Sequence, residues 1–209
     1  MGTIKTKGII LVEHNMGDFD KMLTMLTPGL GKISCAARGA KRFKSSLLVG
    51  SQFLCFGEYV LYKSATTYYI NSCEPIEIFY NIRKDLDKLR YASYITKIII
   101  DVTDENENDY KVLQLYLNTL YMISETDKDL EFIVAIFKLK LMNILGFTPQ
   151  ITKCLNCGET NLEYFSFKDS GFKCAICGKQ DTGAVHVTAR NNSINKIYYD
   201  GTYKKSFFF

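Results

Sequence analysis

Four cysteines near the end of the chain have the spacing of a metal site. Cys154 and Cys157 form one Cys-x-x-Cys pair, Cys174 and Cys177 form a second, and sixteen residues separate the two pairs. Two thiolates on a tight turn direct their sulfurs at one ion, and a second pair completes tetrahedral coordination. The spacing fits the four-cysteine zinc template. We therefore predict one structural Zn²⁺ per chain, because four thiolates leave no open position for water or substrate.

Three other uses of these cysteines remain open, namely two disulfides, a redox-active thiol pair and a site that no longer binds metal. A catalytic zinc of the nucleobase-deaminase type is not indicated, because His-x-Glu and Pro-Cys-x-x-Cys are both missing. The start of the chain lacks the pattern of a secretory signal, and no apolar run is long enough to span a bilayer. We expect a cytoplasmic protein that does not act at a membrane, which disfavours disulfides.

The second candidate site is a cluster of positive charge. From Lys21 to Gly57 there are six Lys or Arg residues and no Asp or Glu. Five of the six lie within thirteen positions, accompanied by one aromatic residue, and the predicted nucleic-acid contacts are Lys32, Arg38, Lys41, Arg42, Phe43 and Lys44. Cations that neutralise phosphates and aromatic rings that stack on bases together hold single strands without reading their sequence.

A plainer interpretation of this cluster is a solvated charged turn. On that interpretation the nearby Phe53, Phe56, Tyr59 and Tyr62 fill the core, because alternation buries half of every strand. We favour the core for these four aromatic residues. Phe43 stands among the charges and is the best candidate for stacking.

The elements that carry these groups change character along the chain. Short β-branched and aromatic runs at residues 3–12, 19–26, 32–37, 53–62 and 66–71 predict five strands of a small closed barrel, of which the OB-fold is one kind. Apolar residues at helical spacing then predict helices over 77–100, 110–124 and 128–145. We expect an α+β, two-domain protein: an OB-fold at 1–76 and a helical domain at 77–209 with the zinc module at about 151–180.

No enzymatic chemistry is indicated. The chain has 209 residues, of which 47% are hydrophobic and 23% are charged, and its net charge is +4. This composition is typical of an ordinary, mildly basic globular protein. The chain has no phosphate-binding Gly-x-x-x-x-Gly-Lys loop, and neither of its two histidines lies in a nucleophilic motif. We predict a protein that is not an enzyme.

Several runs resemble the RecO family of bacterial recombination mediators, in order and over essentially the whole chain. They are residues 8–12, 17–28, 31–34, 37–45, 82–86, 91–94 and 145–147, the last just before the four cysteines. The run Ala-Arg-Gly-Ala-Lys-Arg at 37–42 is the most specific of them. Chains similar to this family usually continue with further helical sequence, whereas this one stops at Phe209, so we also expect a shortened C-terminus.

The resemblance implies an OB-fold followed by a helical domain that holds a zinc module. It implies binding of single-stranded and duplex DNA, annealing of complementary strands, and work with RecR and single-stranded-DNA-binding protein to load RecA. The family's basic barrel surface corresponds to Lys32, Arg38, Lys41, Arg42 and Lys44. The competing hypothesis is a zinc-ribbon subunit that binds another protein and has no annealing activity. A metal-dependent nuclease or deaminase is a remote third.

Overall fold

The computed structural model describes residues 2–64 and 67–187. Its chain divides into two compact units, Met1–Val134 and Ala135–Phe209, which are described separately below. The expected shortened C-terminus lies outside the described residues. The expected domain boundary between residues 76 and 77 stays a prediction.

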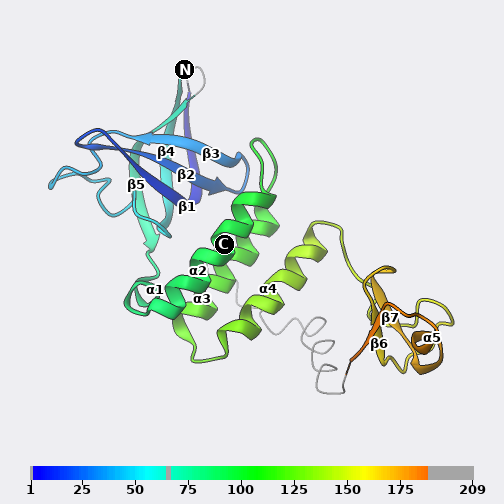
Figure 1. Cartoon of the computed structure of the whole chain (residues 1–209). Helices are drawn as coiled ribbons and strands as arrows, with labels where there is room; N and C mark the ends of the chain where they lie inside the picture. Colours follow the sequence, from blue (N-terminus) through cyan, green and yellow to red (C-terminus); the bar gives the residue numbers. More distant parts are fainter. Residues whose placement is uncertain (1, 65–66, 188–209) are drawn as a thin grey trace. The chain divides into compact units, whose positions relative to one another are not determined.

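The first unit opens with a closed barrel of five strands in the order β1-β2-β3-β5-β4 (Figure 1). Four of its strand pairs are antiparallel, and β3 runs parallel to β5. This closure is the OB-type barrel predicted from the sequence. The strands are β1 (Thr3–Met16), β2 (Asp20–Thr27), β3 (Gly31–Ala37), β4 (Phe56–Ser64) and β5 (Thr67–Glu77).

The long strand β1 makes the closure possible, because it pairs with two neighbours in succession. Its first half, Thr3 to Ile9, pairs with β4, and its second half, Ile9 to Met16, pairs with β2. The register shifts between Ile10 and Val12, and such a bulge bends the strand. Inward side chains of all five strands then form one core, which includes Ile10, Leu23, Met25, Ile33, Cys35, Tyr59, Leu61 and Ile70.

The helical part differs from the prediction of one helix over residues 77–100. Strand β5 continues to Glu77, and two helices follow, α1 (Tyr80–Lys84) and α2 (Leu86–Val102). Asp85 separates them because its backbone is extended and its carboxylate accepts hydrogen bonds from the N–H groups at the start of α2. The other two helices are α3 (Tyr110–Glu125) and α4 (Leu130–Ile144).

Two sets of contacts join the barrel to the helices of the first unit. The N–H of Lys32 donates to the carbonyl of Asp104 at 3.0 Å, and Gly31 beside it has φ +65°. A Cβ on Gly31 would lie 2.1 Å from the Asp104 oxygen, so only glycine fits there. On another side, Arg83 of α1 donates to the carbonyl of Phe53 at 2.6 Å. The first unit is therefore held together by specific hydrogen bonds as well as by packing.

The described part of the second unit contains a small module after α4. Its antiparallel strands β6 (Tyr164–Ser166), β7 (Gly171–Lys173) and β8 (Ala184–His186) pair in the order β7-β6-β8, and helix α5 (Ala175–Lys179) follows β7. Lys173 is buried, and its ammonium donates to Asp169 at 2.5 Å and Asp181 at 2.8 Å. Because a buried charge is costly without a partner, this pair of carboxylates fixes the turn geometry of the module.

Candidate nucleic-acid interface and metal centre

Five of the six predicted nucleic-acid contacts lie together where β3 ends. Arg38, Lys41, Arg42, Phe43 and Lys44 are all exposed, and the side chain of Phe43 is 92% exposed. We call residues 38–44 the basic loop. An aromatic ring that is almost fully exposed to water gains nothing from packing within the protein, so it is available to stack on a planar group of a ligand.

The basic loop is fixed by the turn that joins β1 to β2. The N–H of Gly39, whose φ is +64°, donates to the Asp20 carboxylate at 2.7 Å. The N–H of Lys41 donates to the carbonyl of Phe19 at 2.9 Å, and the Arg42 guanidinium lies 5.3 Å from the centre of the Phe19 ring. Two side chains that sequence reasoning missed therefore position the loop. The available signal was Asp20, the last carboxylate before the stretch without acids.

Lys32 is not brought to the basic loop. It lies near the start of β3, and Arg38 follows the end of that strand, so six residues separate them by about 20 Å. The Lys32 ammonium donates to the carbonyl of Ile100 at 2.6 Å, near the C-terminal end of α2. A cation is favourable at that end of a helix. The ammonium of Lys32 therefore has a structural partner, and its role as a DNA contact stays a prediction.

The nearby aromatic residues divide between the core and the surface. Phe56 and Tyr59 are buried as expected, and the Tyr59 hydroxyl donates to the carbonyl of Gly50 at 2.8 Å. Tyr62 is half-buried on the outside of the barrel, where its ring lies 6.4 Å from that of its cross-strand partner Tyr69. The core interpretation thus holds for Phe56 and Tyr59, but not for Tyr62. Nor does it hold for Phe53, which is half-buried in the loop before β4.

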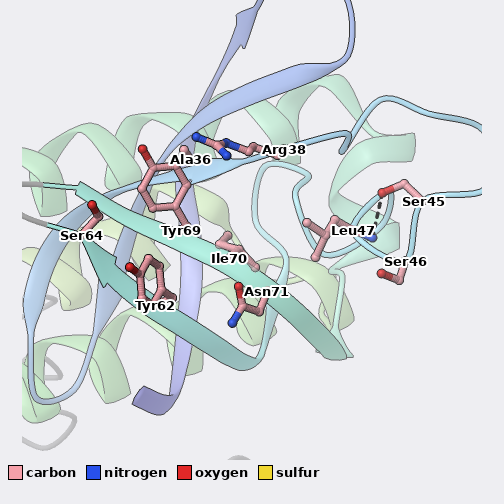
Figure 2. A pocket seen from close by; sticks show the side chains of 10 residues that line it. All are labelled: Ala36, Arg38, Ser45, Ser46, Leu47, Tyr62, Ser64, Tyr69, Ile70 and Asn71. Carbon is pink, nitrogen blue, oxygen red and sulfur yellow. Dashed lines mark hydrogen bonds between the residues drawn. The ribbon is translucent and has the colours of Figure 1, made fainter. Parts of the chain in front are cut away.

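A cavity of about 470 Å³ lies between the outer face of β4 and β5 and the loop after β3 (Figure 2). Its volume is in the range of small-ligand sites. Buried Leu47 and Ile70 are its apolar parts, and the guanidinium of Arg38 lies 4.7 Å from the centre of the Tyr69 ring. The lining residues are Ala36, Arg38, Ser45, Ser46, Leu47, Tyr62, Ser64, Tyr69, Ile70 and Asn71, none of which is acidic.

The four predicted metal ligands converge in the second unit. The sulfurs of Cys154, Cys157, Cys174 and Cys177 all lie within 4.8 Å of one another, and the Cys157 and Cys174 sulfurs are 3.6 Å apart. Four sulfurs at tetrahedral Zn–S distances would be separated by about 3.8 Å. The geometry therefore fits one tetrahedral metal ion.

Backbone turns aim the sulfurs of both pairs. The N–H of Gly158 donates to the Cys154 carbonyl at 3.0 Å, and the N–H of Gly178 donates to the Cys174 carbonyl at 2.8 Å. Burial opposes ionisation of the Cys154 thiol, but backbone N–H groups from both cysteine pairs donate to its sulfur and lower its pKa to about 6. A thiolate is the metal-binding form of cysteine, so this site is prepared for a cation.

One of the two histidines lies in the small module of the second unit. His186 lies in β8 with its ring edge-on to Tyr164 at 5.1 Å. Among the described residues, no helix is long and apolar enough to cross a membrane.

Comparison with known proteins covers both units. Residues 1–79 match the family model "Recombination protein O N terminal", and residues 83–207 match "Recombination protein O C terminal". The DNA repair protein RecO of Acetivibrio thermocellus is 43% identical over 190 residues, which are 90% of this chain and 76% of that protein. The RecO of Alkaliphilus metalliredigens is 38% identical over 186 residues, 88% of this chain and 76% of that protein. The two family models together match most of the chain, and these two relatives are 43% and 38% identical to it, so the chain belongs to the RecO family of DNA repair proteins.

Proposed function

We propose that this protein is a recombination mediator that binds single-stranded DNA and anneals complementary strands without a chemical step. The observation that carries the proposal is the basic loop, where Arg38, Lys41, Arg42 and Lys44 are exposed around the ring of Phe43. Such a surface suits a flexible, charged strand whose bases are free to stack. Duplex DNA offers the same phosphates and is proposed as a weaker ligand.

Annealing follows from the same features. The cations neutralise phosphates of one strand and so reduce its repulsion of a second strand. Because the contacts are to phosphates and to one aromatic ring, they leave most base edges free for pairing. The Asp20 and Phe19 contacts hold the loop in place, so little ordering entropy is lost when DNA binds.

The metal is proposed to be one structural Zn²⁺. Four thiolates at tetrahedral spacing suit zinc, although the same ligands also bind iron. Cys154, Cys157, Cys174 and Cys177 would hold the ion, which would cross-link the two cysteine turns and stabilise the module. Its four sulfur ligands leave no place for substrate, in keeping with a non-enzymatic role.

The proposed partners are RecR, single-stranded-DNA-binding protein and, indirectly, RecA in the bacterial cytoplasm. This protein would displace single-stranded-DNA-binding protein from gapped DNA and help RecA to load there. These steps extend the role in DNA repair that the family membership supports.

A second candidate function is a zinc-ribbon subunit that binds another protein and does not anneal DNA. Exposed apolar side chains on the module favour it, since Phe167 is 72% exposed and Ile176 is 73% exposed. Exposed apolar side chains mark a protein interface where they form a contiguous patch. On this alternative, neutralising the basic loop would leave function unchanged.

The test is annealing of complementary oligonucleotides coated with single-stranded-DNA-binding protein. The variant carries Lys41→Ala, Arg42→Ala and Lys44→Ala. A control variant carries Lys84→Ala, Lys97→Ala and Lys111→Ala, which remove the same charge from exposed helical positions. We expect acceleration by the protein and by the control, and its loss in the basic-loop variant. Equal acceleration by both variants would favour the second candidate function.

A further inference from the structure

The cavity beside the basic loop has the chemistry of a nucleotide site. Its walls combine two aromatic rings, one guanidinium and several neutral hydrogen-bonding side chains, and none of its ten lining residues is acidic. An anionic, partly aromatic ligand matches that combination better than a purely apolar one. Figure 2 shows the strand side of the cavity with Tyr62 and Tyr69, opposite the loop that carries Ser45 to Leu47.

The two tyrosines form one aromatic surface. They are paired across β4 and β5, so they lie on the same outer face, with ring centres 6.4 Å apart and planes tilted by 42°. Both rings are only half-buried. A base can therefore stack on this surface without opening the barrel core, whose buried Ile70 lies beneath it.

Arg38 links this surface to the basic loop. Its guanidinium lies 4.7 Å from the centre of the Tyr69 ring, and its side chain remains exposed. A guanidinium that lies over a ring keeps its N–H groups in its own plane, pointing outward, where they can still bind a phosphate. On the opposite wall of the cavity lie Ser45 and Ser46, and the exposed cation Lys44 directly precedes them in the chain.

We propose that this cavity binds one unpaired nucleotide of a DNA single strand, with its base on Tyr62 and Tyr69 and its phosphate at Arg38. The inference rests on the proposed function and adds a base-holding site to the phosphate contacts of the basic loop. A paired base is covered by its neighbours on both faces, so the cavity selects single strands over duplex. A free nucleotide lacks the additional phosphates that reach the basic loop, so thymidine monophosphate binds more weakly than the strand.

The experiment compares two strands of equal length and charge, oligothymidine and an oligonucleotide of abasic sites. The wild-type protein binds oligothymidine about five- to 150-fold more tightly, the range expected for one stacked base. The double variant Tyr62→Ala, Tyr69→Ala loses the part of that preference that the cavity contributes and keeps only the part due to Phe43, whereas Tyr62→Phe, Tyr69→Phe keeps the full preference because the rings remain. Tyr80→Ala, which removes a 57% exposed tyrosine from α1, is the matched control and keeps it too.

The outcomes separate this inference from the proposed function. In one outcome the alanine variant binds DNA in a salt-dependent way and still prefers oligothymidine to the abasic strand as strongly as the wild type does. That result overturns the nucleotide site and leaves the proposed function intact. Absence of binding to either strand overturns both. Absence of a fold in the alanine variant would leave the first experiment unread, so a second measurement uses the wild-type protein.

A strand that contains 5-iododeoxyuridine is photocrosslinked to the wild-type protein, and the adduct is expected on Tyr62 or Tyr69. Adducts confined to Phe43 overturn the inference.

Discussion

Removing the carboxylate of Asp20 should weaken DNA binding even though the change makes the protein more positive. Asp20 accepts a hydrogen bond from the Gly39 N–H at 2.7 Å and so holds the basic loop against the β1–β2 turn. Hydrogen bonds to charged groups contribute about 1.5–3 kcal/mol, and Asp20 is half-buried, so we take about 1.5 kcal/mol for Asp20→Ala. That loss corresponds to about a tenfold increase in local opening of the loop.

The matched control is Asp18→Ala, which removes an exposed carboxylate two residues earlier, in the turn that precedes β2. If charge alone mattered, both variants would bind single strands equally or more tightly than the wild type. We expect that only Asp20→Ala binds less tightly and that hydrogen exchange of the Gly39 amide accelerates about tenfold in that variant alone. Equal exchange and equal affinity in the two variants would refute the idea that Asp20 positions the loop.

Three further predictions concern the metal centre and the link between barrel and helices. Cys174→Ala should abolish binding of one zinc per chain, measured by elemental analysis, whereas Cys35→Ala should retain it because that thiol lies in the barrel core. Acidification should release zinc, because protons compete with the ion for the four thiolates, and a zinc-sensitive dye would report the release as the pH is lowered. Gly31→Ala should cost about 2–4 kcal/mol in urea unfolding, because of its φ of +65° and the crowding of its missing Cβ, whereas Gly29→Ala, with open space around it, should change stability little.

The sequence was most informative where the structure depends on local pattern. Alternation over residues 3–12 and 32–37 predicted strands that the barrel contains, because burying one face of a strand requires a period of two. The four cysteines predicted their own convergence, since two Cys-x-x-Cys turns have few other ways to be used.

The sequence was least informative where one segment positions another. Phe19 and Asp20 hold a loop about twenty residues further along, and no local pattern indicates that pairing. Lys32 belongs to the charge cluster in sequence, but an extended strand carries it to the far end of β3. The break at Asp85 was missed for a different reason, since helical spacing of apolar residues continues across it and only the cap ends the helix.

The salt dependence of single-strand binding tests the central claim most directly. Four exposed cations in the basic loop predict that log affinity falls with log salt concentration at a slope of about −2.8. Replacing Lys41, Arg42 and Lys44 by alanine should bring the slope to about −0.7, and the control with Lys84, Lys97 and Lys111 replaced should keep the wild-type slope. An unchanged slope in the basic-loop variant would contradict the claim that this loop is where the protein holds DNA.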